Sequence, residues 1–65
     1  MINRDYLSEI GTLTQRLHNI DIDVSVYHNR SADKFIVRQD DNLSAFDYPS
    51  QVVTYLESLL EHAND

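Results

Sequence analysis

The chain has 65 residues, of which 42% are apolar and 25% are charged, and it contains no cysteine. A chain of this length forms one small domain and has no room for a separate cofactor-binding domain. The lack of cysteine excludes disulfides and thiolate metal clusters, so we expect a cytoplasmic protein. No secretory signal pattern and no apolar run of about 18 residues is present, so we expect no association with a membrane.

Acidic residues outnumber basic ones by 11 to 5, which gives a net charge of −6. The excess lies in the C-terminal third, because no lysine or arginine follows Asp40. Negative charge repels phosphate backbones, so nucleic acid is disfavoured as a partner. The acidic third either keeps the domain soluble or presents a negative face to a basic partner, and the sequence leaves both interpretations open.

The first predicted element is an amphipathic helix over residues 3–18, with Asn3 as its cap. Gly11 lies inside this helix, where glycine destabilises, and we expect a close approach of another backbone to compensate. The apolar stripe of the helix repeats at spacings of four and three residues and comprises Tyr6, Ile10, Leu13, Leu17 and Ile20, with Leu7 at its side.

Strict alternation of apolar and polar residues over 20–28 predicts a strand with one dry and one wet face. Residues 29–32 are typical of a turn, and residues 34–39 return as the second strand of a hairpin. Charge and hydrophobicity favour the same register for this hairpin. The register pairs Val24 with Val37, Val26 with Phe35 and Asp23 with Arg38.

Residues 43–46 are long enough for a third strand, but their facing depends on the preceding turn. A two-residue turn at positions 41–42 places Phe46 in the core, whereas a three-residue turn buries Leu43 and Ala45 instead. We favour the two-residue turn.

A second helix begins near Pro49, whose missing N–H does no harm there, and Asp47 is the expected cap. On the sheet side we expect a core of Ile22, Val24, Val26, Phe35 and Val37, covered by Leu13, Leu17, Leu56 and Leu60. The apolar stripe of the second helix comprises Val52, Val53, Leu56, Leu59, Leu60 and Ala63.

The element order α-β-β-β-α predicts an α+β two-layer sandwich, in which both helices cover one face of a three-stranded antiparallel meander. Residues 1–65 form a single small acidic domain in this interpretation. The order resembles that of the double-stranded-RNA-binding domain. That family holds RNA phosphates with a lysine-rich start to its second helix, where this chain has Asp47-Tyr48-Pro49-Ser50-Gln51.

Residues that could carry chemistry are sparse. The three histidines, His18, His28 and His62, include no pair at the i,i+4 spacing of helical metal ligands, and one glycine cannot form a phosphate-binding loop. The paired carboxylates Asp21 and Asp23 alternate outward from a strand. We therefore expect no enzyme activity, no metal and no cofactor.

The wet face of the sheet carries the best candidate for recognition, formed by Tyr27, Lys34, Ile36 and Arg38. An aromatic ring and an aliphatic side chain beside two cations have the composition of a protein interface. We expect a noncatalytic interaction protein (an adaptor, inhibitor or accessory factor) that binds a protein partner, or itself as a homodimer, through this face.

Two alternatives remain open at this stage. The chain could be a nucleic-acid-binding module with the topology of the double-stranded-RNA-binding domain, using Arg16, Arg30, Lys34 and Arg38. It could instead mimic nucleic acid by placing its C-terminal carboxylates in a partner's basic groove.

Overall fold

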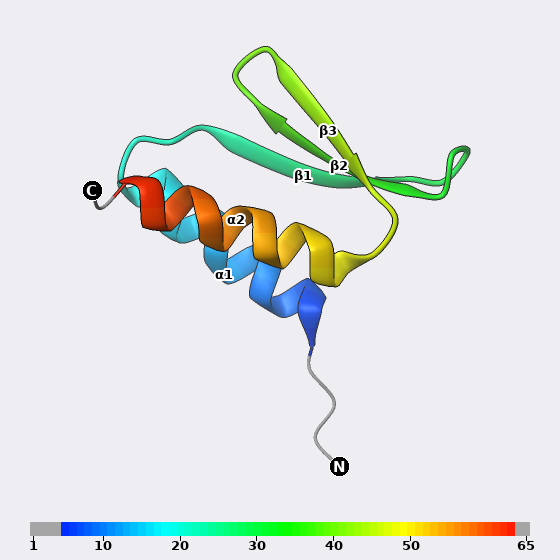
Figure 1. The fold of residues 1–65 in the computed structure, drawn as a ribbon, viewed down its shortest axis with the longest axis horizontal. Coiled ribbons are helices and arrows are strands. Elements are labelled where there is room, and N and C mark those ends of the chain that lie inside the picture. Colours follow the sequence, from blue (N-terminus) through cyan, green and yellow to red (C-terminus); the bar gives the residue numbers. More distant parts are fainter. Residues whose placement is uncertain (1–4, 64–65) are drawn as a thin grey trace.

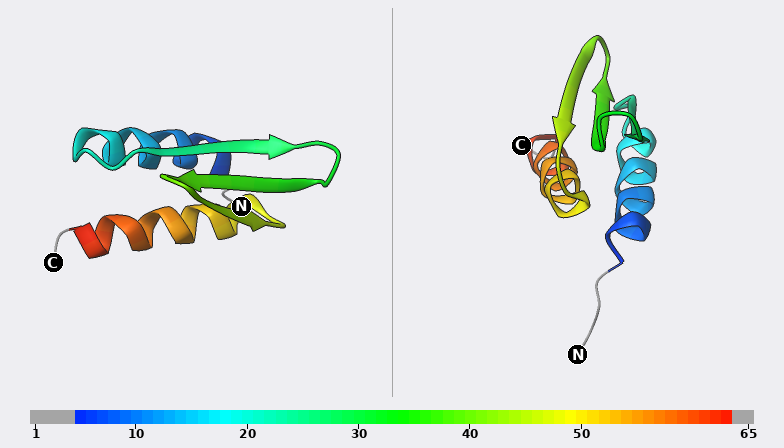
Figure 2. Two further views of the ribbon diagram at one scale, coloured as in Figure 1. Left: turned by 90° about the horizontal axis from the view of Figure 1, so that it is seen from above. Right: turned by 90° about the vertical axis from the view of Figure 1, so that its right-hand side faces the viewer.

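The structure is a computed structural model that describes residues 5–63. Strands β1, β2 and β3 form one antiparallel sheet in the order β1-β2-β3. Helices α1 and α2 lie side by side, point in the same direction and cover one face of this sheet (Figures 1 and 2). The predicted two-layer α+β sandwich with an antiparallel meander is confirmed. The elements are α1 (Tyr6–Asn19), β1 (Val24–Asn29), β2 (Lys34–Gln39), β3 (Asn42–Phe46) and α2 (Pro49–Ala63).

Helix α1 begins at a side-chain cap. The Asp5 carboxylate accepts a hydrogen bond of 3.1 Å from the Ser8 backbone N–H, which satisfies one free donor of the first turn. Asn3, the predicted cap, lies outside the described residues. The expected close approach at Gly11 is wrong, because a Cβ atom built there has no neighbouring atom within 4 Å. Gly11 therefore weakens the helix without a compensating contact.

The connection from α1 to β1 ends the helix and delays the strand. Asp21 adopts a left-handed backbone conformation with φ of 65°, which interrupts the alternation that predicted a strand from residue 20. Strand β1 consequently begins at Val24, and Ile20 is an exposed residue at the end of the helix. The His18 ring nitrogen Nε2 lies 2.8 Å from the Val24 carbonyl oxygen, so this side chain joins α1 to β1.

The predicted hairpin register is wrong by two residues. Val26, and not Val24, lies opposite Val37, and Ser25 lies opposite Arg38 where Asp23 was expected. A shift of two residues preserves the facing of every side chain, so the apolar row of β1 still points toward the helices.

The loop of this hairpin explains the shift. Strand β1 continues to Asn29, and the loop comprises residues 30–33 in place of the predicted 29–32. The Asn29 side chain accepts a hydrogen bond of 3.2 Å from the Ala32 backbone N–H, and Asp33 takes a left-handed conformation with φ of 54°. Both residue types favour such local turn geometry, so they fix where the loop closes.

The turn between β2 and β3 has two residues, as favoured from the sequence, but it lies one position earlier, at Asp40 and Asp41. Asp40 supplies the left-handed conformation with φ of 54°. Phe46 faces the helices opposite Phe35, and Leu43 points to the other face with 64% of its surface exposed. The predicted facing of β3 is therefore correct.

The core lies between the sheet and the two helices. Five of the nine residues predicted for it are buried, and the other four, Ile22, Val26, Phe35 and Leu60, are partly buried against them. Tyr55 of α2 closes the core beside β3, with its ring centroid 5.5 Å from that of Phe46. The buried residues are Ile10, Leu13, Leu17, Val24, Val37, Val52, Val53 and Leu56.

Candidate functional site

The outer face of the sheet carries a row of apolar side chains across all three strands, and no helix within residues 5–63 covers it (Figure 2). Tyr27 of β1 pairs with Ile36 of β2, and Ile36 pairs with Ala45 of β3. All three lie on the face opposite the buried Val37, because successive side chains of a strand point to opposite faces. The structure thus brings the predicted residues Tyr27 and Ile36 together as a cross-strand pair.

Leu43 extends this row, since it lies two residues from Ala45 on the same face of β3. Tyr27 exposes 50% of its surface and Leu43 exposes 64%. We call Tyr27, Ile36, Leu43 and Ala45 the open-face patch. The sequence prediction missed Leu43 and Ala45 as members, although the favoured two-residue turn already placed both side chains outside.

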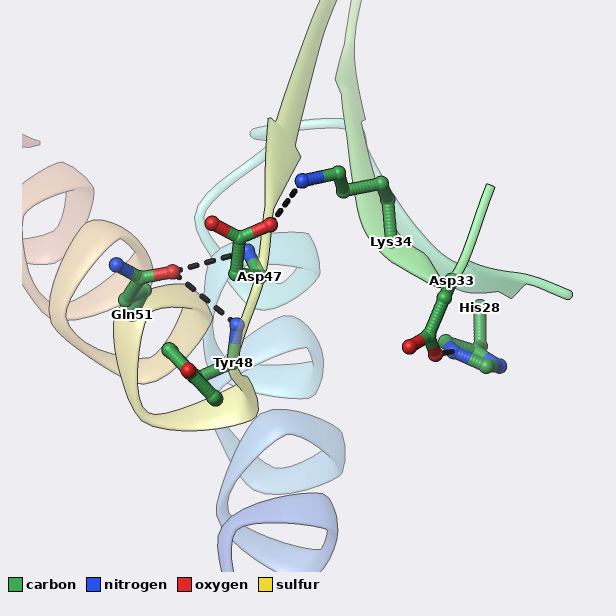
Figure 3. Close-up of polar contacts among 6 residues, drawn as sticks. All are labelled: His28, Asp33, Lys34, Asp47, Tyr48 and Gln51. Carbon is green, nitrogen blue, oxygen red and sulfur yellow. Dashed lines mark hydrogen bonds and ion pairs between the residues drawn. The ribbon is translucent and has the colours of Figure 1, made fainter. Parts of the chain in front are cut away.

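Lys34, also predicted for the site, is held at the end of β2 by an ion pair. Its ammonium group contacts the Asp47 carboxylate, which belongs to the connection between β3 and α2 (Figure 3). The hydrogen bond and the negative charge of Asp47 raise the pKa of Lys34 above its ordinary value of 10.5. Lys34 therefore lies at the edge of the open-face patch as one half of an ion pair.

This ion pair replaces the predicted role of Asp47 as a helix cap. The Gln51 side-chain oxygen accepts hydrogen bonds from the backbone N–H groups of Asp47 and Tyr48, at 3.0 and 3.1 Å (Figure 3). Gln51 reaches back from the first turn in the manner of a capping box. The start of α2 is thus fixed by Gln51, which leaves the Asp47 carboxylate to bind Lys34.

Arg38, the fourth predicted residue, lies at the opposite end of β2. Its Nε donates a hydrogen bond of 3.3 Å to the Asp40 carbonyl oxygen, and it lines a small polar hollow with Asp23, Ser25 and Asp40. Arg38 lies between Ser25 and Leu43 in the sheet, so it flanks the open-face patch. The outer face has an apolar centre and charged ends, as protein interfaces have.

A second surface feature is the groove between the two helices. Carboxylates line it from both sides, with Asp5 at the cap of α1 and Glu9 within α1 on one side and Glu57 of α2 on the other. Arg16 also lines this groove and is thus remote from Lys34 and Arg38 on the sheet. The cations considered for nucleic acid binding therefore do not gather on one surface.

His28 makes contacts within its own hairpin. His28 Nε2 lies 3.3 Å from the Asp33 carboxylate, and its ring lies 4.8 Å from that of Phe35, so it stabilises the hairpin end (Figure 3). Within residues 5–63, no group of three or more His, Asp or Glu side chains is placed to hold a metal ion. None of the helices in the same range combines the length and the apolar character needed to cross a bilayer.

No protein-family model, no curated protein and no solved structure matches this chain.

Proposed function

We propose that this chain is a noncatalytic interaction protein that binds a protein partner through the outer face of its sheet. The observation that carries the proposal is the uncovered apolar row Tyr27–Ile36–Ala45, which crosses all three strands. Aromatic side chains in the centre of a patch contribute most to the affinity of protein interfaces. Ile36 of the middle strand is at the centre of the row, and Tyr27 pairs directly with it and supplies the aromatic ring.

Charged groups at both ends of this face keep it compatible with a folded monomer in water. The Lys34–Asp47 ion pair lies at one end and Arg38 lies at the other, so the apolar patch is narrow and bordered by charge. A narrow apolar patch bordered by charge does not cause the free protein to aggregate, and its apolar side chains are still removed from water when a partner binds.

The test is a pair of double variants. Tyr27→Ser with Ile36→Ser removes the aromatic ring and the central aliphatic residue of the open-face patch, while Leu7→Ser with Tyr48→Ser removes one aliphatic and one aromatic residue that are exposed outside the sheet. After circular dichroism shows that both variants fold, their affinities for the partner recovered from the native cells are measured. We expect the sheet variant to bind about 30-fold more weakly, the effect of losing about 2 kcal/mol at a hot spot, and the control to bind normally.

Equal binding by the two variants would refute the proposal. Sedimentation of the same proteins distinguishes the two kinds of partner, because a homodimer that uses this face dissociates only in the sheet variant. If the Tyr27 and Ile36 variant binds the partner normally, the acidic surface of α2 around Glu57 and Glu61 becomes the better candidate for the binding surface.

A second candidate function is mimicry of nucleic acid by the interhelical groove. The specific observation is that carboxylates of α1 and α2 line this groove from both sides, with Asp5, Glu9 and Glu57 around it. The variant Glu57→Gln with Glu61→Gln tests this function, because a partner with a basic groove then binds more weakly and with a smaller dependence on salt.

A further inference from the structure

Strand β3 is an edge strand whose outer side is open. The sheet order is β1-β2-β3, and among residues 5–63 no strand pairs with β3 on the side away from β2. The pair Gln39–Asn42 closes the two-residue turn and is therefore a hydrogen-bonded pair of the ladder. Such pairs alternate with non-bonded ones, so the backbone N–H and C=O groups of Leu43 and Ala45 point to the open side.

The two edges of the sheet differ in their protection. At the β1 edge, His18 of α1 lies against the Val24 carbonyl oxygen at 2.8 Å, and α1 packs along the strand. Strand β3 (Asn42–Phe46) has no lysine, arginine or proline, the residues that usually prevent pairing at an edge. Its two outward side chains, Leu43 and Ala45, are both exposed. The β3 edge is therefore the open pairing site of this sheet.

We propose that β3 binds an extended segment of a partner protein, which adds to the sheet as a fourth strand. This inference rests on the proposed function, since the added strand would continue the outer face from the open-face patch. Backbone hydrogen bonds from Leu43 and Ala45 hold the segment, and its alternate side chains pack beside Leu43 and Ala45. The segment therefore has an apolar residue at its centre.

Charge at one end of β3 specifies the rest of the segment. Asp40 and Asp41 precede the strand, in a chain of net charge −6, whereas Asp47 at the other end is already bound to Lys34. Opposite charges on neighbouring strands stabilise pairing, whereas like charges destabilise it. The bound segment accordingly carries lysine or arginine near the end that lies beside Asp40 and Asp41.

The same charges disfavour a second copy of this chain as the occupant. Antiparallel pairing of two β3 strands with full overlap places Ser44 opposite Ser44 and Asp41 opposite Asp47 of the second copy. Asp41 of each copy then meets no cation, because the facing Asp47 is a carboxylate already bound to Lys34, and each chain has a net charge of −6. A basic segment of another protein avoids this repulsion.

The experiment uses a display library of strand-length peptides that have two lysines at each end around a randomised centre. A matched library has two glutamates at each end. We expect the lysine library to enrich at least tenfold over the glutamate library on the intact chain. Bound peptides should slow amide hydrogen exchange at Leu43 and Ala45, the two open-edge residues.

A pair of variants separates backbone pairing from side-chain contact. Ala45→Pro removes the open-edge N–H, and edge strands tolerate proline at such positions, whereas Ala45→Thr keeps the N–H. We expect binding of the selected peptides to weaken at least tenfold in Ala45→Pro and less than threefold in Ala45→Thr. If Ala45→Pro fails to fold, Leu43→Pro makes the same test at the other open amide.

Four results would overturn the inference. They are no enrichment, equal enrichment of both libraries, peptides that bind equally to Ala45→Pro, and a dimer of the free chain whose Leu43 and Ala45 amides are already protected. Partner binding that needs Tyr27 and Ile36 but survives Ala45→Pro would leave the proposed function intact and remove strand addition alone.

Discussion

Leu56 offers the sharpest test of the packing that supports the sheet. Its side chain is 0% exposed, in the layer of α2 that meets both α1 and the sheet. Truncation to alanine leaves a cavity at the centre of the core. Such changes cost about 2–5 kcal/mol. A domain of 65 residues has a free energy of unfolding of about 3–10 kcal/mol, so Leu56→Ala should remove a large part of it.

The assay is urea denaturation followed by circular dichroism, with Leu7→Ala as the control. Leu7 lies on α1 with 64% of its surface exposed, and its truncation should change the free energy of unfolding by less than about 0.5 kcal/mol. Each kcal/mol lowers the melting temperature of a domain this small by about 4–8 °C, so Leu56→Ala should melt at least about 8 °C lower. Equal midpoints for the two variants would refute the assignment of Leu56 to the core.

Three further changes test the interior and the cap of α1 and the Lys34–Asp47 ion pair. Gly11→Ala should stabilise the domain by about 0.5–1 kcal/mol in chemical denaturation, because the added Cβ meets no atom within 4 Å; a loss of stability would reveal a contact at this position. Asp5→Ala should cost about 1 kcal/mol through loss of the bond to Ser8, and Asp5→Asn should restore most of it. The pKa of Lys34 is raised in the folded protein, so its pairing with Asp47 stabilises fully below pH 10.5 and is lost as the pH rises through the raised value. The difference in stability between the wild type and Lys34→Gln should therefore narrow above pH 10.5, and a constant difference would contradict the ion pair.

Side-chain facing could be predicted from the sequence because it depends only on local periodicity. The alternation Val24, Val26 in β1 and Phe35, Val37 in β2 fixed which face is buried. A shift of the β1–β2 register by two residues leaves that pattern unchanged, so hydrophobicity could not distinguish the observed register from the predicted one. The deciding contact is the bond between Asn29 and the loop, which periodicity does not report.

The parts of the site that were missed depend on contacts between distant residues. Lys34 and Asp47 are 13 positions apart, and the Asp47 carboxylate contacts Lys34 while Gln51, from the first turn of α2, accepts the hydrogen bonds at the start of that helix. Gly11 shows the opposite case, in which a local rule suggested a long-range contact that the fold does not make. The place of Leu43 in the open-face patch could have been predicted, because the favoured two-residue turn between β2 and β3 already puts its side chain on the outer face.

The central claim is that the outer face of the sheet is the binding surface, and site-specific photo-crosslinking tests it most directly. Benzoylphenylalanine is placed at Tyr27, in the open-face patch, or at Leu7, which is exposed on α1 outside the sheet. Both proteins are produced in the native cells and irradiated there. We predict a covalent adduct with one protein partner from the Tyr27 position and none from the Leu7 position. An adduct from Leu7 alone, or the same adducts from both positions, would contradict the account.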